Sequence, residues 1–282
     1  MKSSRAVIVV FVLAAGGAAF LLWRGRHQPA PATPAPVARP APAPAPPPPP
    51  PVAVPTPPAV QHPVAPEPSV EPLPELDGSD GYFRNALGTL LGKKGVASFL
   101  TLDGFARRFV ATVNNLDTDT PAAQLWPVNR TPGALEVSAT AGGSELTTAN
   151  AGRYAPFVRL VEGIDAARAV AVYRRAYPLL QKAYEDLGFP GKYFNDRVVA
   201  VLDHLLATPE PPERIKVKRA EVAGAPPGTG RGLYLFDDPT LESRSSGQKI
   251  LLRIGRDNSR TLKGKLAEVR RLIARGPGET AP

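Results

Sequence analysis

Acidic, basic and imidazole side chains gather in one segment of the chain, Tyr193–Pro211, which reads YFNDRVVAVLDHLLATPEP. Carboxylates and imidazoles move protons in enzymes, so this segment is the strongest candidate for acid–base chemistry. Asp203 and His204 are adjacent, however, and neighbouring side chains on a helix point about 100° apart, so these two cannot form a catalytic pair. A catalytic His204 would need a nucleophile or carboxylate from elsewhere in the fold. We therefore assign no catalytic residue here.

The same segment has the pattern of a core helix. Apolar side chains recur at helical spacing along it, at Val198, Val199, Val201, Leu202, Leu205 and Leu206. Asn195 has the residue type and position of an N-cap, so we predict that it caps this helix. The remaining polar side chains place Asp196 and Asp203 on one face, and Arg197 and His204 on the adjacent face. We predict that these four residues form a recognition surface.

Ligands for a transition metal are scarce. The chain has no cysteine, and two of its three histidines, His27 and His62, lie in a proline-rich stretch, which leaves His204 as the imidazole of the folded part. One imidazole without a thiol is too few for a usual zinc site. The sequence also lacks the glycine-rich phosphate-binding motifs and the G-x-S-x-G serine motif. We predict neither a metal nor a cofactor.

A calcium loop is suggested, and then disfavoured, by the spacing after residue 114. Asn115, Asp117 and Asp119 stand at alternate positions, as the first three ligands of such a loop do. Thr120 occupies the place of the required glycine, and Trp126 occupies the place of the final acidic ligand. We therefore interpret the asparagine and the aspartates as turn formers.

An uncharged apolar run of eighteen residues, Ala6–Trp23, lies near the N-terminus. It is about long enough to span a ~30 Å hydrocarbon core, and longer than the ~7–15 apolar residues of a cleaved signal peptide. Arg24 and Arg26 follow Trp23, the usual order of interfacial anchors. Basic residues flank both ends, so the distribution of positive charge does not decide the orientation. A short N-terminus followed by a spacer and a long C-terminal part favours export of the C-terminal part. We predict cytoplasmic residues 1–5, a membrane helix at residues 6–23 in the inner membrane, and a periplasmic C-terminal domain.

Proline dominates the part of the chain that follows. Of the 35 prolines, 21 lie between Gln28 and Pro74. This composition cannot bury enough apolar surface to offset the entropy of ordering, and Pro-Ala repeats favour extended polyproline II. We predict that residues 24–74 form a disordered spacer, that residues 75–275 form one globular domain, and that residues 276–282 form a disordered tail.

The predicted domain is mainly helical with a small antiparallel β element. Apolar residues recur at helical spacing over most of it, and the longest such pattern begins at Asp165 and ends at Gly188. ALEVSAT and ELTTA around Ala141-Gly142-Gly143-Ser144 predict a hairpin, and IKVKRAEV and GLYLF predict two further short strands. Strands and helices do not alternate, so we predict an α+β fold without a Rossmann sheet.

Three segments of the folded part carry a resemblance. RRFVATVNNL, FNDRVVAVLDHLLATP and LESRSSGQKILLRIG resemble the signature segments of a proteobacterial family, the Domain of Unknown Function 3014 family. The resemblance runs from about Gly81 to Arg275. It implies a membrane-anchored envelope protein without an assigned activity, and it supplies no catalytic residue.

The charge distribution of the folded part and the predicted membrane anchor indicate the expected partners. Residues 75–282 carry 29 Lys and Arg against 23 Asp and Glu, with the signs interspersed and no basic run among aromatics, which argues against nucleic acid. The expected partners are the bilayer, through Ala6–Trp23, and an envelope protein or the cell wall. The leading hypothesis is a periplasmic binding or scaffold module held off the membrane. The alternative is an envelope hydrolase that acts on glycan or peptide through unidentified carboxylates.

Overall fold

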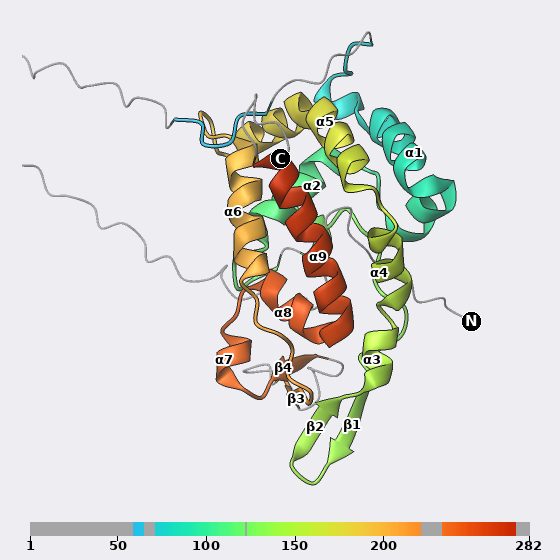
Figure 1. Cartoon of the computed structure of the whole chain (residues 1–282), viewed down its shortest axis with the longest axis vertical. Coiled ribbons are helices and arrows are strands. Elements are labelled where there is room, and N and C mark those ends of the chain that lie inside the picture. The colour runs from blue at the N-terminus through green and yellow to red at the C-terminus, as the bar shows by residue number, and fades with distance from the viewer. Residues whose placement is uncertain (1–58, 65–70, 122, 221–232, 275–282) are drawn as a thin grey trace, which may run out of the picture.

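A computed structural model describes residues 59–64, 71–121, 123–220 and 233–274 (Figure 1). The predicted membrane segment, most of the predicted spacer and the predicted tail lie outside these residues. Within the described ranges, no helix combines the length and the apolar composition that crossing a membrane requires.

Helices make up most of the described chain. In chain order the α-helices are α1 (Asp80–Phe99), α2 (Phe105–Asn115), α3 (Thr148–Gly152), α4 (Ala155–Glu162), α5 (Ala166–Asp186), α6 (Phe194–Leu206), α7 (Pro239–Glu242), α8 (Ser246–Arg253) and α9 (Arg256–Ile273). Two 3-10 turns, η1 (Leu76–Gly78) and η2 (Ala123–Leu125), flank α1 and α2. The strands are β1 (Val137–Thr140), β2 (Gly143–Leu146), β3 (Lys216–Arg219) and β4 (Tyr234–Phe236). α1 is interrupted at Gly92, whose φ of 74° is not helical.

The four strands form one antiparallel sheet in the order β1-β2-β3-β4. The predicted hairpin is confirmed: Thr140 at the end of β1 pairs with Gly143 at the start of β2. Val217 and Phe236 of the sheet are buried with Leu252 of α8 in a small apolar cluster. The described chain is therefore mainly α with a small antiparallel β element, as predicted.

The main core lies where α6 packs against α2, α5 and α9 (Figure 1). Each helix has apolar residues three and four positions apart, so each buries one face. Phe109 of α2, Leu180 of α5, Leu202 of α6 and Leu266 of α9 are all buried in this cluster. The apolar stripe predicted for the segment after Tyr193 is thus confirmed as a core face.

The start of α6 differs from the prediction. Asn195 is not the N-cap, because α6 begins at Phe194 and Asn195 lies within its first turn, completely buried. Two side chains of α5 bind the N–H groups at this end: Gln181 Oε1 accepts from Phe194 N (2.8 Å), and the Tyr177 hydroxyl accepts from Asn195 N (3.4 Å). The helix is thus capped from a neighbouring helix, which leaves the Asn195 side chain for other contacts.

Residues Ala59–Val64 precede the predicted start of the domain at residue 75, yet they contact it. The N–H groups of Gln61 and His62 donate to the carboxylate of Asp196 in α6, and Val64 packs against the main core. Contacts with the helical part therefore begin inside the stretch that composition assigned to the spacer.

Leu202→Ala should lower the free energy of unfolding by ~2–5 kcal/mol, because it removes buried apolar area and leaves a cavity in the main core. The matched control is Leu187→Ala, the same substitution at a side chain that is 42% exposed; its effect should stay within about 0.5 kcal/mol. Denaturant titration of the two variants measures both values. Equal losses would contradict the assignment of α6 as a core helix.

Candidate functional site

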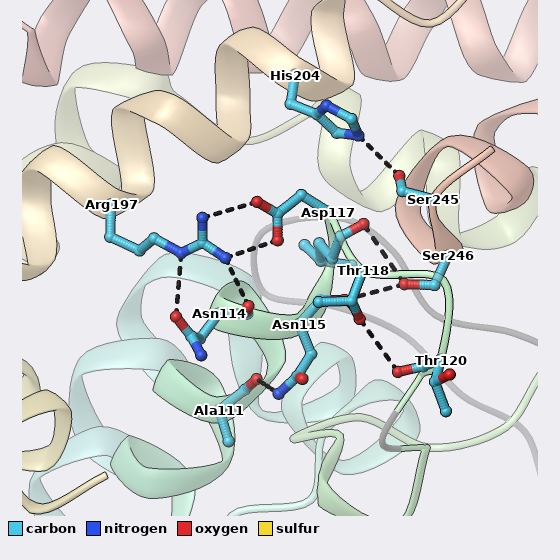
Figure 2. A network of polar contacts seen from close by, with 11 residues as sticks. Ala111, Asn114, Asn115, Asp117, Thr118, Thr120, Arg197, His204, Ser245 and Ser246 are labelled. Atoms are coloured by element: carbon cyan, nitrogen blue, oxygen red, sulfur yellow. Dashed lines mark hydrogen bonds and ion pairs between the residues drawn. The ribbon is translucent and has the colours of Figure 1, made fainter. Parts of the chain in front are cut away.

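Three segments that are distant in sequence meet at one junction (Figure 2). They are the end of α2 with the loop that follows it, the face of α6 that carries Arg197 and His204, and the start of α8. The three sequence segments that carry the family resemblance are the ones that converge here. Their polar contacts define the candidate site.

Arg197 joins α6 to the loop after α2. Its guanidinium makes a two-pronged ion pair with the Asp117 carboxylate, with N–O distances of 2.7 and 2.6 Å. It also donates to the side-chain oxygen (3.0 Å) and the backbone carbonyl (2.6 Å) of Asn114. Both partners of the ion pair are about three-quarters covered. Parallel donation to one carboxylate fixes position as well as charge, so Arg197 holds this loop against α6.

The same loop also binds the start of α8. Ser246 N donates to Thr118 O (2.7 Å), and Gly247 N donates to Leu116 O (2.8 Å). The Ser246 hydroxyl donates to Asn115 O (3.0 Å). These bonds occupy N–H groups in the first turn of α8, which would otherwise be a place for an anion.

Gly247 permits this contact because it has no side chain. A Cβ at this position would lie 2.6 Å from Leu205 Cδ2 and 2.8 Å from the Leu116 carbonyl oxygen. Both separations are well below van der Waals contact. The start of α8 can therefore approach the loop and α6 this closely only with glycine at this position.

The loop residues that resemble calcium ligands bind protein groups instead. Asn115 Nδ2 donates to Ala111 O, Asp117 pairs with Arg197, and the Thr120 hydroxyl donates to the Asp119 carboxylate. Across the described ranges, no group of three or more His, Asp or Glu residues is arranged to hold a metal ion.

A pocket of about 500 Å³ opens beside the junction. Its lining is polar and comprises Asp117, Asp119, His204, Thr240, Ser243, Arg244, Ser245 and Gln248. Its lining residues include His204 near the end of α6, Thr240 of α7 and Gln248 of α8. These elements meet at the end of α6 opposite to the end that contacts Ala59–Val64 (Figure 1). A pocket that presents hydroxyls, an amide, carboxylates and a guanidinium suits a polar ligand.

The serine of the serine–histidine contact in this pocket, and the N–H groups that follow it, are bound to other groups of the fold. His204 Nε2 and Ser245 Oγ share a hydrogen bond of 2.8 Å. Ser245 is the N-cap of α8 and its Oγ also accepts from Gln248 N, so the hydroxyl has a structural role. The N–H groups of Ser246 and Gly247, the nearest donors for an oxyanion, already donate to loop carbonyls. The arrangement fixes His204 in position and offers no free oxyanion donor at the start of α8.

The four residues predicted as one recognition surface lie apart and all contact other parts of the chain. Arg197 and His204 belong to the junction. Asp203 faces α9, where Arg270 donates to both of its oxygens at 2.8 and 2.9 Å. Asp196 binds the Gln61–His62 backbone. Of the four, His204 lines the pocket, and so does Ser245, to which it is hydrogen-bonded.

Sequence reasoning did not identify Asn114, Ser245 or Gly247 as residues of the site. Ser245-x-x-Gln248 has the spacing of a capping box, and this signal could have located the start of α8. Gly247 and Asn114 carry no local signal, because their roles depend on contacts with segments far away in the chain.

The described chain is a mainly helical domain with a polar pocket at the junction of α6, α7 and α8. Residues 105–270 match the family model described as Protein of unknown function (DUF3014), and the chain belongs to this family. The match includes the junction and the whole lining of the pocket. No curated protein and no solved structure matches the chain.

Gly247→Ala should destabilise the fold by about 1–3 kcal/mol, because the added methyl group forces the start of α8 away from the Leu116 carbonyl. Gly264→Ala is the matched control: it lies in α9 with nothing within 4 Å of an added Cβ, and should stabilise the helix by about 0.5–1 kcal/mol. Thermal or denaturant unfolding of the two variants measures the change in stability, which should be a loss for Gly247→Ala and a gain for Gly264→Ala. A neutral or stabilising Gly247→Ala would contradict the close-approach assignment.

Proposed function

We propose that this chain is a single-pass protein of the inner membrane whose periplasmic domain is a binding module, held off the membrane by the proline-rich stretch. The anchor is supported by the uncharged run Ala6–Trp23 and its basic flank. The spacer is supported by the prolines of residues 24–74, whose extended conformation reaches ~3.1 Å per residue. Such a tether is useful to a domain that meets a partner away from the bilayer.

The observation that supports binding rather than catalysis is that polar groups around the pocket are already bound to other groups of the fold. Asp117 is held by Arg197, and the Ser245 hydroxyl caps α8. Residues committed to hydrogen bonds of the fold make a rigid wall, which favours recognition of a ligand. A hydrolase that works through two carboxylates needs both of them available. Of the two in the lining, Asp119 is exposed but Asp117 is paired with Arg197.

The lining favours a polar ligand of the cell wall. The Thr240 and Ser243 hydroxyls and the Gln248 amide each donate to another group of the fold, so their oxygens are the atoms that face a ligand as acceptors. Arg244 adds a guanidinium and Asp119 an exposed carboxylate. Hydroxyls and amides suit sugar hydroxyls, and the guanidinium suits a peptide carboxylate. Peptidoglycan presents both kinds of group, so we propose it as the ligand.

The orientation of the anchor is tested in cells. Alkaline phosphatase fused after Pro282 should be active, because this enzyme folds only outside the cytoplasm, and carbonate washing should leave the fusion with the membranes. An inactive phosphatase fusion together with an active cytosolic reporter at the same position would reverse the proposed orientation.

The pocket is tested with insoluble peptidoglycan and the purified full chain. The protein should sediment with the peptidoglycan, and Arg244→Ala should reduce the bound fraction several-fold, because it removes the guanidinium from the pocket. Arg271→Ala is the matched control, since Arg271 is exposed on α9 and is not among the pocket's lining residues.

Equal losses in the two variants would mean non-specific attraction by positive charge and would contradict the pocket assignment. Release of soluble peptidoglycan fragments would overturn the binding proposal in favour of the hydrolase alternative. Absence of sedimentation would remove peptidoglycan as the ligand.

A further inference from the structure

The start of α6 binds a short segment of the chain through the segment's backbone. Ala59–Val64 lies beside this end of α6 and close to the end of α9 (Figure 1). His62 is bound at three of its polar atoms: its N–H donates to Asp196 Oδ1 (2.7 Å), its carbonyl accepts from Asn195 Nδ2 (2.8 Å), and its Nδ1 contacts Ala274 O (3.2 Å). Gln61 N donates to the other oxygen of Asp196 (3.1 Å).

Asp196 is available for this contact because other groups serve the helix. An aspartate in the first turn of a helix commonly binds the helix's own N–H groups. Here Gln181 and Tyr177 of α5 accept from the N–H groups of Phe194 and Asn195. The Asp196 carboxylate instead accepts from two consecutive backbone N–H groups outside the helix, where the chain bends at Gln61 and His62. Successive N–H groups that converge at a bend form a concave site for an anion such as a carboxylate.

Asn195, the residue before Asp196, also contacts the segment. Its side chain is completely buried, and its Nδ2 donates to His62 O (2.8 Å) and Ile273 O (3.1 Å). Its Oδ1 accepts from the Tyr173 hydroxyl (2.9 Å). Burial raises the pKa of Tyr173 well above its ordinary value, so this phenol keeps its proton and donates. Removal of the segment would leave one Asn195 donor without its protein acceptor, and an unpaired buried donor is costly.

Two side chains of the segment face the domain, one on either side of Pro63. His62 and Val64 are half-buried toward the domain, whereas Gln61 and Pro63 are exposed. Backbone hydrogen bonds therefore supply most of the polar contact, and the two inward side chains supply the selectivity. A segment with histidine and an aliphatic residue two positions later fits.

We propose that the N-terminal end of α6, with Asn195, Asp196 and the Ala274 carbonyl, is a binding site for a short peptide segment, and that Ala59–Val64 of the same chain occupies it. The segment acts as a latch that fixes where the preceding chain joins the domain. α6 has 13 residues and so is ~20 Å long, and the polar pocket lies at its other end. The chain that leads to the proposed anchor therefore joins the domain at the end of α6 opposite to the pocket.

Spin labels can test the latch, because the chain contains no cysteine. Val60→Cys places one label on the segment and Ala200→Cys places the other on α6; both positions are exposed. Pulsed electron paramagnetic resonance on the full chain in detergent should give one narrow distance distribution. Asp196→Ala should broaden it, because the acceptor of two N–H groups is lost. Asp203→Ala, the matched change on the same helix, should leave it narrow.

A second variant distinguishes release of the segment from unfolding of the Asp196→Ala protein. His62→Pro removes the His62 N–H and the imidazole but lies outside every helix, so it should broaden the distribution while far-ultraviolet circular dichroism stays unchanged. A broad distribution in the parent chain, or a narrow one in both variants, would overturn the proposal. This readout is independent of membrane insertion, so it separates failure of the latch from failure of the anchor.

Recognition of peptide is tested on the emptied site. A synthetic peptide of residues 57–66, spin-labelled at position 60, should restore the parent distance when added to the His62→Pro chain labelled at position 200. The same peptide with proline in place of His62 should not. If neither peptide restores the distance, site selectivity is refuted. A parent distance between chains labelled only at position 60 and chains labelled only at position 200 would assign the occupant to a second copy and overturn the cis latch.

Discussion

The close approach of α8 to the loop after α2 is the constraint on which the site depends. Gly247 lets the first turn of α8 donate N–H groups to the carbonyls of Leu116 and, through Ser246, of Thr118. That contact places the Ser245 hydroxyl within hydrogen-bond distance of His204. Arg197 completes the junction by holding the same loop from α6. The pocket wall is therefore a consequence of packing that the main core already requires.

The contacts that build the pocket also determine what it can do. A serine beside a histidine would suggest nucleophilic chemistry if only the pair were considered. In this fold the serine caps a helix, and the adjacent N–H groups are bound to carbonyls. Polar groups that are satisfied by the protein lose little by staying in place, so they form a preorganised surface and are poor reactants. The binding role that we propose is supported by this satisfaction more than by the shape of the pocket.

Local patterns predicted the elements well, and contacts between distant residues poorly. The apolar stripe with Leu202, the hairpin at Ala141-Gly142 and the helix start at Asp165 each depend on a few neighbouring residues, and the structure contains all three. Asn195 was assigned to a cap because its type and position fit one. The prediction failed because Gln181 and Tyr177, which are distant in sequence from the helix start, supply the acceptors. No pattern within one helix carries that information.

The same limit explains why the four polar residues of α6 were grouped together. Helical spacing correctly places Asp196 and Asp203 on one face, but it does not show what each end of the helix meets. Asp196 accepts from the backbone of Gln61 and His62 at one end, and Asp203 pairs with Arg270 of α9 further along. His204 marks the opposite end, where the pocket opens. A core helix whose apolar face is fixed by packing can thus serve two unrelated polar tasks at its ends, because the termini and the exposed flank are the parts that the core does not use.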